Sequence, residues 1–399
     1  MIPRSTTAAK LPRAVWALGF VSLLMDASSE LVHSLLPLYM AAGLGATMVT
    51  IGVVEGVAEA VAQIVKVFSG TLSDYFGKRK GLTVVGYALA ALSKPMFPLA
   101  TSVAWVFTAR VLDRIGKGIR GAPRDALIAD VTPSELRGAA YGLRQALDSV
   151  GAFIGPMLAI ALMLAFHNDF KVALWVAVVP ALAAVLVAVV AVDEPTSISQ
   201  PRGRAPLSLA DTSRLGRAYW GVVILGLVFT LARFSEAFLV LRARDLGLGL
   251  DFAPLVLLVM SVVYAALAYP AGIAADRISA RVLLVLGLLV LVAADLVFAG
   301  AHTTVGLLSG AGLWGTQLAL TQGLLSKLIA DTAPVDLRGT AFGIFNLVSG
   351  VALLAASVIA GYLWDAYGAA ATFEAGAVFA GVAALGVLLH ASLRATTRD

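Results

Sequence analysis

The sequence contains no cysteine, and only 13% of its 399 residues are charged. Without cysteine the chain forms neither disulfide bonds nor thiolate metal sites. The low charge excludes an ordinary soluble domain, in which about 25% of the residues are charged. The enzyme motifs H-E-x-x-H and G-x-S-x-G are absent, and no segment has the spacing of a phosphate-binding cofactor loop. We therefore predict that the protein is not an enzyme and carries no cofactor.

Hydrophobic residues are abundant instead. They make up 60% of the sequence, and the mean hydropathy is +0.91. Apolar runs of roughly 20 residues recur along the chain, each long enough to cross about 30 Å of hydrocarbon as an α-helix. A membrane barrel would instead give short alternating strands. The sequence predicts an all-α membrane protein that has the lipid bilayer as its surroundings.

The apolar runs number about twelve. They are expected at Val15–Met40, Thr50–Thr71, Gly81–Ala100, Ser102–Ile128, Ala139–Phe166, Val172–Val192, Tyr219–Leu241, Phe252–Ala275, Val282–Gly300, Thr304–Ala330, Thr340–Trp364 and Ala371–Ser392. A polar stretch rich in proline, serine and arginine divides them into two groups of six. We predict an N-terminal bundle at 1–192, a linker at 193–217 and a C-terminal bundle at 218–399.

Lysine and arginine concentrate in alternate loops and in both terminal tails, as in Lys78, Arg79 and Lys80. Because cytoplasmic loops carry the excess of these residues, both termini are expected in the cytoplasm and the protein in the inner membrane. This bias accounts for the net charge of +5, so we expect no nucleic-acid partner. A monomer is expected.

An internal repeat relates the two bundles. Residues 127–142 return as residues 328–343, with ten of sixteen positions identical at an offset of 201. An offset near half the chain indicates a duplicated unit of six helices, whose copies are related by an axis along the membrane normal. The sequence therefore predicts two pseudo-symmetric six-helix bundles.

Charged residues inside the spans are expensive in hydrocarbon, so they are expected to face a wet interior. Asp26 and Glu30 are one helical turn apart, as are Glu55 and Glu59, and each pair forms a stripe on its span. The second copy has Leu257 where the first has Glu55, so these charges are not needed merely to fold six helices. We predict that these four acids couple transport to protons.

Other polar groups of the spans are predicted to line a substrate cavity. They are His33, Lys66, Lys94, Arg110, Asp113, Arg114, Lys117, Arg144, Asp148, Arg233, Glu236, Gln317, Gln322 and Asn346.

Several alternatives remain open from the residues alone. Pairs such as Arg144 and Asp148 fit a fixed helical ion pair as well as a functional one. His33 fits either a metal ligand together with Asp26 and Glu30, or a packed histidine. The basic face of the fourth span suits an anionic substrate, but it also suits neutralisation of acids on neighbouring helices.

Two segments carry a family resemblance. Residues 70–80, Gly-Thr-Leu-Ser-Asp-Tyr-Phe-Gly-Lys-Arg-Lys, resemble the signature loop between the second and third helices of the major facilitator superfamily (MFS), although Tyr75 replaces the usual basic residue. Residues 151–156, Gly-Ala-Phe-Ile-Gly-Pro, resemble the fifth-helix motif of its antiporters. The resemblance implies a gating role for Gly70, Asp74, Gly77, Lys78, Arg79, Gly151, Gly155 and Pro156.

A looser resemblance, carried by residues 113–127, is to bacterial drug or metal-chelate exporters of the same superfamily. The histidine-rich tail of the nickel group is absent. The resemblance implies alternating access and a proton-coupled exporter of a small molecule, metal ion or metal chelate. A proton-coupled uptake symporter is the alternative, since the direction of transport is not written in these residues, and a non-transporting membrane receptor is a further one.

Overall fold

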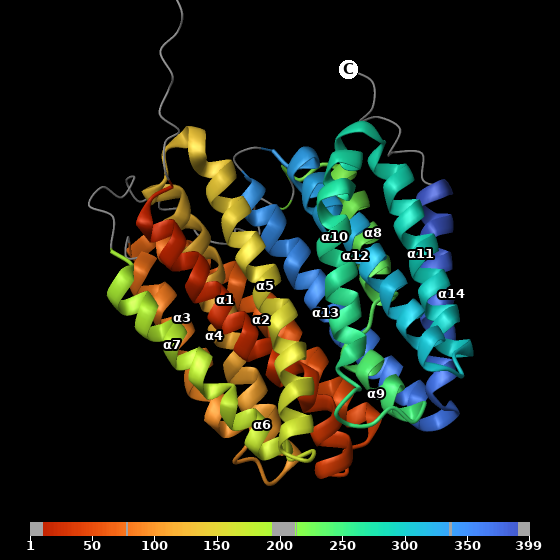
Figure 1. Cartoon of the computed structure of the whole chain (residues 1–399). Helices are drawn as coiled ribbons and strands as arrows, with labels where there is room; N and C mark the ends of the chain where they lie inside the picture. Colours follow the sequence, from red (N-terminus) through yellow and green to blue (C-terminus); the bar gives the residue numbers. More distant parts are fainter. Residues whose placement is uncertain (1–10, 77–78, 194–211, 213, 335–336, 390–399) are drawn as a thin grey trace, which may run out of the picture.

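The computed structural model describes residues 11–76, 79–193, 212, 214–334 and 337–389, and this part of the chain consists of helices and turns without a strand. Its helices form two bundles side by side, one from each half of the sequence (Figure 1). The first bundle contains α1 Arg13–Leu38, η1 Tyr39–Gly43, α2 Met48–Phe76, α3 Arg79–Ser93, η2 Lys94–Met96, α4 Val103–Val131, η3 Ser134–Leu136, α5 Arg137–Ala165, α6 Phe170–Val176 and α7 Val178–Ala191.

The second bundle repeats this arrangement. It contains α8 Arg217–Leu231, α9 Ala237–Asp245, α10 Leu255–Arg277, α11 Ala280–Gly300, α12 Thr304–Thr332, α13 Arg338–Tyr367 and α14 Ala369–Leu389. Each of the twelve predicted spans contains at least one helix in its described part, so the predicted fold class is confirmed. The proposed linker at 193–217 lies mostly outside the described residues, and its bounds stay a prediction.

The duplication extends to helix capping. The side chain of Ser102 accepts a hydrogen bond from the backbone N–H of Trp105 at the start of α4, and Thr303 accepts one from Gly306 at the start of α12. These caps are 201 positions apart, the offset of the sequence repeat. A hydroxyl at this position satisfies an N–H that has no partner within the helix, so both copies begin their fourth span by the same device.

The seventh span differs from the prediction. A continuous helix was expected over Tyr219–Leu241, but α8 ends at Leu231 and α9 begins at Ala237. The residues between them include Arg233 and Glu236, whose charged side chains are directed to the interior cavity described below. The break exposes backbone groups inside the protein, where a membrane helix tolerates them.

The halves meet through small residues on the side away from the start of α1 and the end of α14, which we call the non-terminal side (Figure 1). A methyl group added to Gly52 of α2 would lie 2.2 Å from the carbonyl oxygen of Ser357 in α13. One added to Gly361 of α13 would lie 2.4 Å from the carbonyl oxygen of Met48. Glycine therefore lets α2 and α13 touch backbone to backbone on this side.

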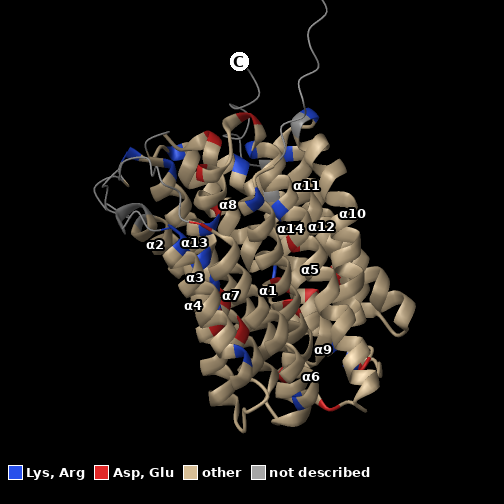
Figure 2. Ribbon diagram, turned by 60° about the vertical axis from the view of Figure 1, so that its left-hand side comes forward, with Lys and Arg blue, Asp and Glu red and all other residues tan. Residues whose placement is uncertain are grey.

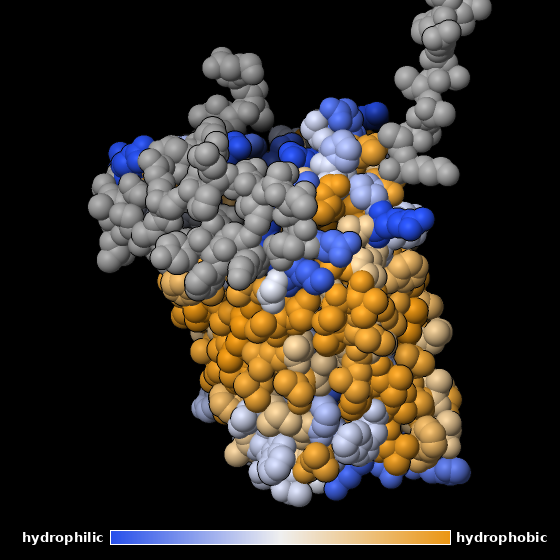
Figure 3. All heavy atoms as spheres, turned by 90° about the vertical axis from the view of Figure 1, so that its left-hand side faces the viewer, coloured by the Kyte–Doolittle hydropathy of each residue, from blue (hydrophilic) through white to orange (hydrophobic). Residues whose placement is uncertain are grey.

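The outer surface fits a bilayer. A continuous hydrophobic band surrounds the visible face, and hydrophilic residues gather above and below it (Figure 3). Leu92, Val179 and Val190 are each more than 60% exposed within helices. Eight of the described helical segments are long and apolar enough to cross a membrane by themselves.

The interior differs from the outer surface. Lysine, arginine and acidic residues occur deep among the helices of the first bundle, and further basic residues gather at the end where the chain begins and ends (Figure 2). Arg110 and Arg114 of α4 are 0% and 3% exposed. These charged side chains therefore face the interior of the bundle, as the sequence predicts.

Candidate functional site

A cavity lies between the two bundles. It has two adjoining parts, of about 420 and 440 Å³, which share Glu30, Glu59, Gln63, Lys117 and Gln322 as wall residues. Thirteen residues predicted for proton coupling or substrate binding line one part or both. They are Asp26, Glu30, Glu59, His33, Lys66, Arg114, Lys117, Arg144, Asp148, Arg233, Glu236 and the amides Gln322 and Asn346.

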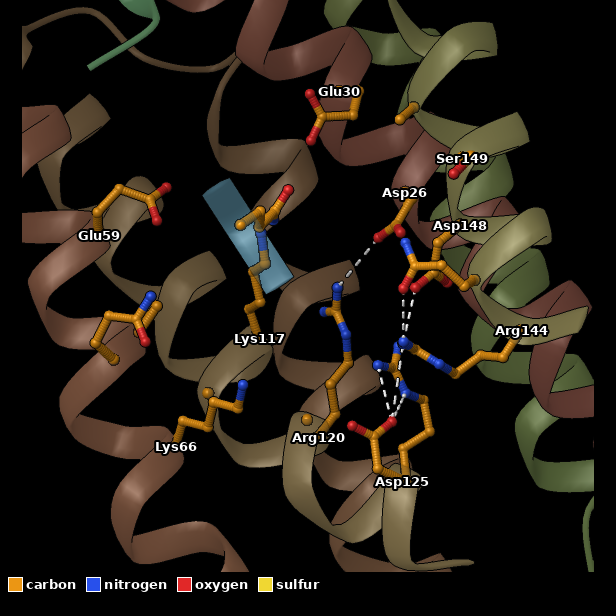
Figure 4. Close-up of a pocket in the computed structure, with 18 of the residues that line it drawn as sticks. Asp26, Glu30, Glu59, Lys66, Lys117, Arg120, Asp125, Arg144, Asp148 and Ser149 are labelled. Atoms are coloured by element: carbon orange, nitrogen blue, oxygen red, sulfur yellow. Dashed lines mark hydrogen bonds and ion pairs between the residues drawn. The ribbon is translucent and has the colours of Figure 1, made fainter. Parts of the chain in front are cut away.

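The two parts have different walls. The first is lined mainly by charged side chains of α1, α2, α4 and α5 (Figure 4). The second extends to the broken seventh span and to α13, where Phe229, Phe234 and Phe345 contribute an apolar surface. The site therefore combines a charged wall from the first bundle with a largely aromatic and amide wall from the second.

Two cavity acids face arginines of α4. Glu59 Oε1 lies 3.1 Å from Arg114 Nη2, and Asp26 Oδ1 lies 3.8 Å from Arg120 Nη2. The two carboxylates remain 25% and 26% exposed, so they are paired and wet at the same time. The acid of each pair is thus in contact with the water of the cavity, whereas its arginine is buried.

A second group of charges lies at the start of α5. Arg144 Nη1 lies 2.7 Å from Asp148 Oδ2, one turn along the same helix, and 3.8 Å from Asp125 Oδ1 of α4. Arg124 also contacts Asp125, with 3.2 Å between Nη2 and Oδ1. Arg144 thus links α4 to α5, which supports the structural alternative for this pair.

Glu55 is not on the cavity wall. It is fully buried, and its Oε2 accepts a hydrogen bond of 2.6 Å from Arg110 Nη2. Arg110 also lies 2.9 Å from Nδ1 of His33, and because arginine only donates, Nδ1 is the accepting nitrogen. The imidazole therefore carries its proton on Nε2, which lies 4.0 Å from Glu236 at the break of the seventh span. Among the described residues, Arg110 and His33 connect Glu55 to the cavity.

Lys94 and Asp113 form another closed pair. The Lys94 ammonium donates to Asp113 Oδ1 at 2.7 Å and to Ser29 Oγ at 3.0 Å. Both charged residues are almost wholly buried, and neither lines the cavity. Gln317 is also buried and bonds to Thr321 within α12. The structure thus places Lys94, Asp113 and Gln317 beside the predicted cavity instead of on its wall.

Of the charged cavity side chains, three from the first bundle have no hydrogen-bond or ion-pair partner among the described residues. They are the carboxylate of Glu30 and the ammonium groups of Lys66 and Lys117. Figure 4 draws Lys66, Lys117 and Glu30 around the hollow without a dashed line to any of them. Arg233 lies over the ring of Phe229, with 5.8 Å between the guanidinium carbon and the ring centroid. These groups are available to a ligand.

The fifth-helix glycines position the acids of α1. A methyl group added to Gly151 would lie 3.0 Å from Cβ of Asp26, and one added to Gly155 would lie 2.4 Å from Cβ of Glu30. The four-residue spacing of the glycines matches that of the acids, so α5 fits closely over both. α5 continues as a helix through Pro156 to Ala165. These contacts favour close packing as the role of the motif.

The signature loop is only partly described. Gly77, Lys78 and the side chain of Asp74 lie outside the part of the chain that the structure describes. Gly70 lies where a methyl group would come within 3.3 Å of Ala122 Cβ in α4. Arg79 Nη1 lies 2.6 Å from Asp130 Oδ2 near the end of α4. The loop is thus tied to α4 within its own bundle.

Two acidic residues that the sequence did not single out have notable positions in the structure. Asp125 lines the cavity, and its place one residue after Arg124 was the available signal. Asp295 is fully buried in α11, and its signal was a single acid within an apolar run. Among the described residues no group of three or more histidines and acids is placed to hold a metal ion, and the metal alternative for His33, Asp26 and Glu30 stays a prediction.

The sequence is similar to those of several known membrane proteins. An uncharacterised MFS-type transporter of Methanocaldococcus jannaschii is 32% identical over 361 residues, which cover 89% of each chain. The multidrug resistance protein MdtH of Photorhabdus laumondii is 30% identical over 156 residues, covering 39% of this chain and 38% of its own.

The fold has a close counterpart among solved structures. The nucleoside transporter NupG superimposes with a TM-score of 0.80 at 14% identity, covering 94% of this chain and 99% of its own. The sequence pattern of the Major Facilitator Superfamily matches residues 18–243 and 221–398, nearly the whole chain. The chain therefore belongs to the Major Facilitator Superfamily of membrane transporters.

Proposed function

We propose that this transporter is a proton-coupled exporter that works by alternating access. The observation that carries the proposal is Glu30, an unpartnered carboxylate where the two parts of the cavity join. A carboxylate in this position binds either a proton or a cationic group of the cargo. Because one occupant excludes the other, proton and cargo cross the membrane in opposite directions.

The acids that pair with arginine, Glu59 and Asp26, also take part in this exchange. Protonation of Glu59 or Asp26 releases Arg114 or Arg120, whereas ionisation restores the pair. Each proton that binds or leaves therefore changes the net charge of the cavity wall. This change alters the relative stability of the two access states. We assign proton coupling to Glu30, Glu59 and Asp26, with Glu55 acting behind them through Arg110 and His33.

The free lysines indicate the other end of the cargo. Lys66 and Lys117 are exposed in the cavity and face no acid within pairing distance among the described residues. A carboxylate or phosphate group would gain charge-assisted hydrogen bonds there. The proposed cargo is a small organic molecule or a metal chelate that carries charges of both signs and an apolar body against Phe229 and Phe345.

The protein is proposed to sit as a monomer in the inner membrane with its termini in the cytoplasm. The basic residues of the terminal side support this orientation by the positive-inside rule (Figure 2). The cavity is then open to the cytoplasm and closed by α2 and α13 on the outer side, ready to load cargo for export. The partial similarity to a multidrug resistance protein is consistent with export.

Uptake by symport is the alternative, and the free lysines favour it for a purely anionic cargo. An anion bound at Lys117 favours protonation of nearby Glu59, so that anion and proton would travel together. The sign of proton flow separates the two. In inside-out vesicles acidified inside, ethidium, nickel citrate and naphthalene carboxylate are added in turn, and internal pH is followed. Antiport raises the internal pH as a compound enters, whereas symport carries protons in with the entering compound and lowers the internal pH.

A further inference from the structure

Asp295 of α11 is an acidic residue that the proposed mechanism does not use. Its side chain is 0% exposed, and neither carboxyl oxygen has a hydrogen-bond partner in the part of the chain that the structure describes. An ionised carboxylate without a partner is strongly destabilised away from water. A protonated carboxyl group is neutral, so it is the form that this environment accepts.

The surroundings of Asp295 are aromatic. The rings of Phe298, Phe373, Phe234 and Trp314 pack together, with centroid distances of 5.0 Å between Phe298 and Phe373 and 5.5 Å between Phe234 and Trp314. The indole Nε1–H of Trp314 is also buried without a partner. The cluster thus holds a carboxyl group in a dry site and provides no cation for it.

Charged groups on the neighbouring described elements do not pair with Asp295. Arg242 of α9 donates to the carbonyl oxygens of Phe298, Ala299 and Ala301 and pairs with Asp245. Other charged or titratable groups are described on α11 and on the elements around it. On α11 and just after it they are Arg281 and His302, and on α12 they are Lys327 and Asp331 near its end. The others are Arg244 of α9, the exposed Glu374 of α14, and Arg233 and Glu236 of the broken span. None of them forms an ion pair with Asp295 in the described structure.

The carboxyl group lies just behind the wall of the central cavity. A methyl group added to Gly376 of α14 would lie 2.7 Å from Asp295 Oδ2 and 3.1 Å from Phe234 Cε1, so Asp295 and Phe234 meet at this glycine. Phe234 is in the break between α8 and α9, and it also lines the central cavity. Its ring therefore separates Asp295 from the water of the cavity.

A small void adjoins that ring on the side of α13 and α14. A cavity of about 10 Å³ is lined by Phe234, Gly376 and Thr372 among others. Thr372 is its one polar lining residue and already donates its hydroxyl to the carbonyl oxygen of Ala360, so the void is a dry space beside the ring. The backbone of residues 232–236 is not helical, so it can change conformation without breaking a hydrogen-bonded helix.

We propose that Asp295 is a proton-binding site of the C-terminal half, loaded and unloaded through the break of the seventh span under control of Phe234. The site extends the proposed coupling from the first bundle to the second. Its use in transport rests on the proposed function, whereas the binding of the proton is independent of it.

Infrared spectroscopy of the purified protein in lipid nanodiscs tests the binding. A protonated carboxylic acid has a carbonyl stretch that is resolved from those of carboxylates and amides. We expect this band at neutral pH in the wild type and in the control E374Q, which changes an exposed acid of the same region, and we expect its loss in D295N. If D295N does not fold, carbon-13 aspartate in the wild type shifts the band instead. A band that D295N or the label leaves unchanged would overturn the proposal.

Exchange into heavy water tests the route. Replacement of the acid proton by deuterium shifts the same band, and we expect F234A to accelerate this shift at least tenfold, while F373A, which opens the cluster away from the cavity, has a smaller effect. Equal exchange rates in F234A and the wild type would exclude the path past Phe234. Because no cargo is involved, these results are separate from success or failure of the transport assay.

Discussion

The carboxylate of Asp365, near the end of α13, caps a helix of the opposite half. Its Oδ1 accepts a hydrogen bond of 3.0 Å from the backbone N–H of Met48, and its Oδ2 accepts one of 2.9 Å from Val49. These N–H groups begin α2, so they have no partner within that helix. The negative charge also faces the positive end of the helix dipole. Asp365 therefore stabilises the contact between the halves on the non-terminal side.

Substitution D365N is expected to weaken that closure. An amide has one acceptor oxygen and no charge, so the loss is about 1 kcal/mol, or about a fivefold shift toward the separated form. The chain lacks cysteine, so S357C, fully buried at the same contact, gives a single reporter thiol. Its labelling by an impermeant maleimide from the non-terminal side should increase about fivefold. D331N, at an exposed acid of α12, should leave labelling unchanged, and equal labelling in D365N would contradict the capping role.

Substitution G52A is expected to separate the halves more strongly. The new methyl group would lie 2.2 Å from a backbone carbonyl oxygen, which has no freedom to move away without displacing α13. We predict at least a tenfold increase in labelling of the same thiol. The matched control is G138A, where nothing lies within 4 Å of the added methyl group. If G52A and G138A label alike, α2 and α13 do not form the closure.

Substitution of the free lysines should weaken binding of anions. Each charge-assisted hydrogen bond contributes about 1.5–3 kcal/mol, so the double variant K66Q/K117Q should bind naphthalene carboxylate at least tenfold more weakly. Binding is measured on the purified protein by isothermal titration calorimetry. K171Q, at an exposed lysine at the start of α6, should bind like the wild type. The same affinity in both variants would place the anionic group of the cargo elsewhere.

The buried pair of Glu55 and Arg110 should contribute mainly to folding. Removing one partner leaves an uncompensated buried charge, which costs about 3–5 kcal/mol. R110Q should therefore lower the stability of the detergent-solubilised protein by that amount in chemical denaturation, and E55Q/R110Q should recover part of it. R244Q, on the exposed face of α9, provides the control. A loss in R110Q as small as that in R244Q would mean that the pair is not formed.

The predictable part of the fold came from local patterns. Length and apolarity place each span, and the spacing of the charges identifies its inner face, as the burial of Arg110 and Arg114 confirms. The repeat at an offset of 201 predicted the pairing of the bundles. These features depend on residues near one another in the sequence, which one chain is sufficient to reveal.

Contacts between helices could not be predicted in the same way. Helical periodicity predicts which face of α2 carries Glu55, but it does not predict which side chain Glu55 contacts. Whether Glu55 reaches the cavity depends on how closely α2, α4 and α1 pack around Arg110 and His33. The break at residues 232–236 contains no proline or glycine, so the usual signal for an interrupted helix was missing. The sequence did contain one indication of the break, because Arg233 and Glu236 would be costly to place in hydrocarbon on a continuous helix.

The central claim is that Glu30 exchanges a proton for the cargo. It is tested most directly in inside-out vesicles with an acidic interior, in which internal pH is recorded as ethidium, nickel citrate or naphthalene carboxylate is added to wild type, E30Q and the exposed-acid control E374Q. We predict that at least one compound enters and raises the internal pH in the wild type and in E374Q, and that E30Q abolishes the pH change. Entry of the same compound with no proton movement in the wild type, or with equal proton movement in E30Q, would contradict it.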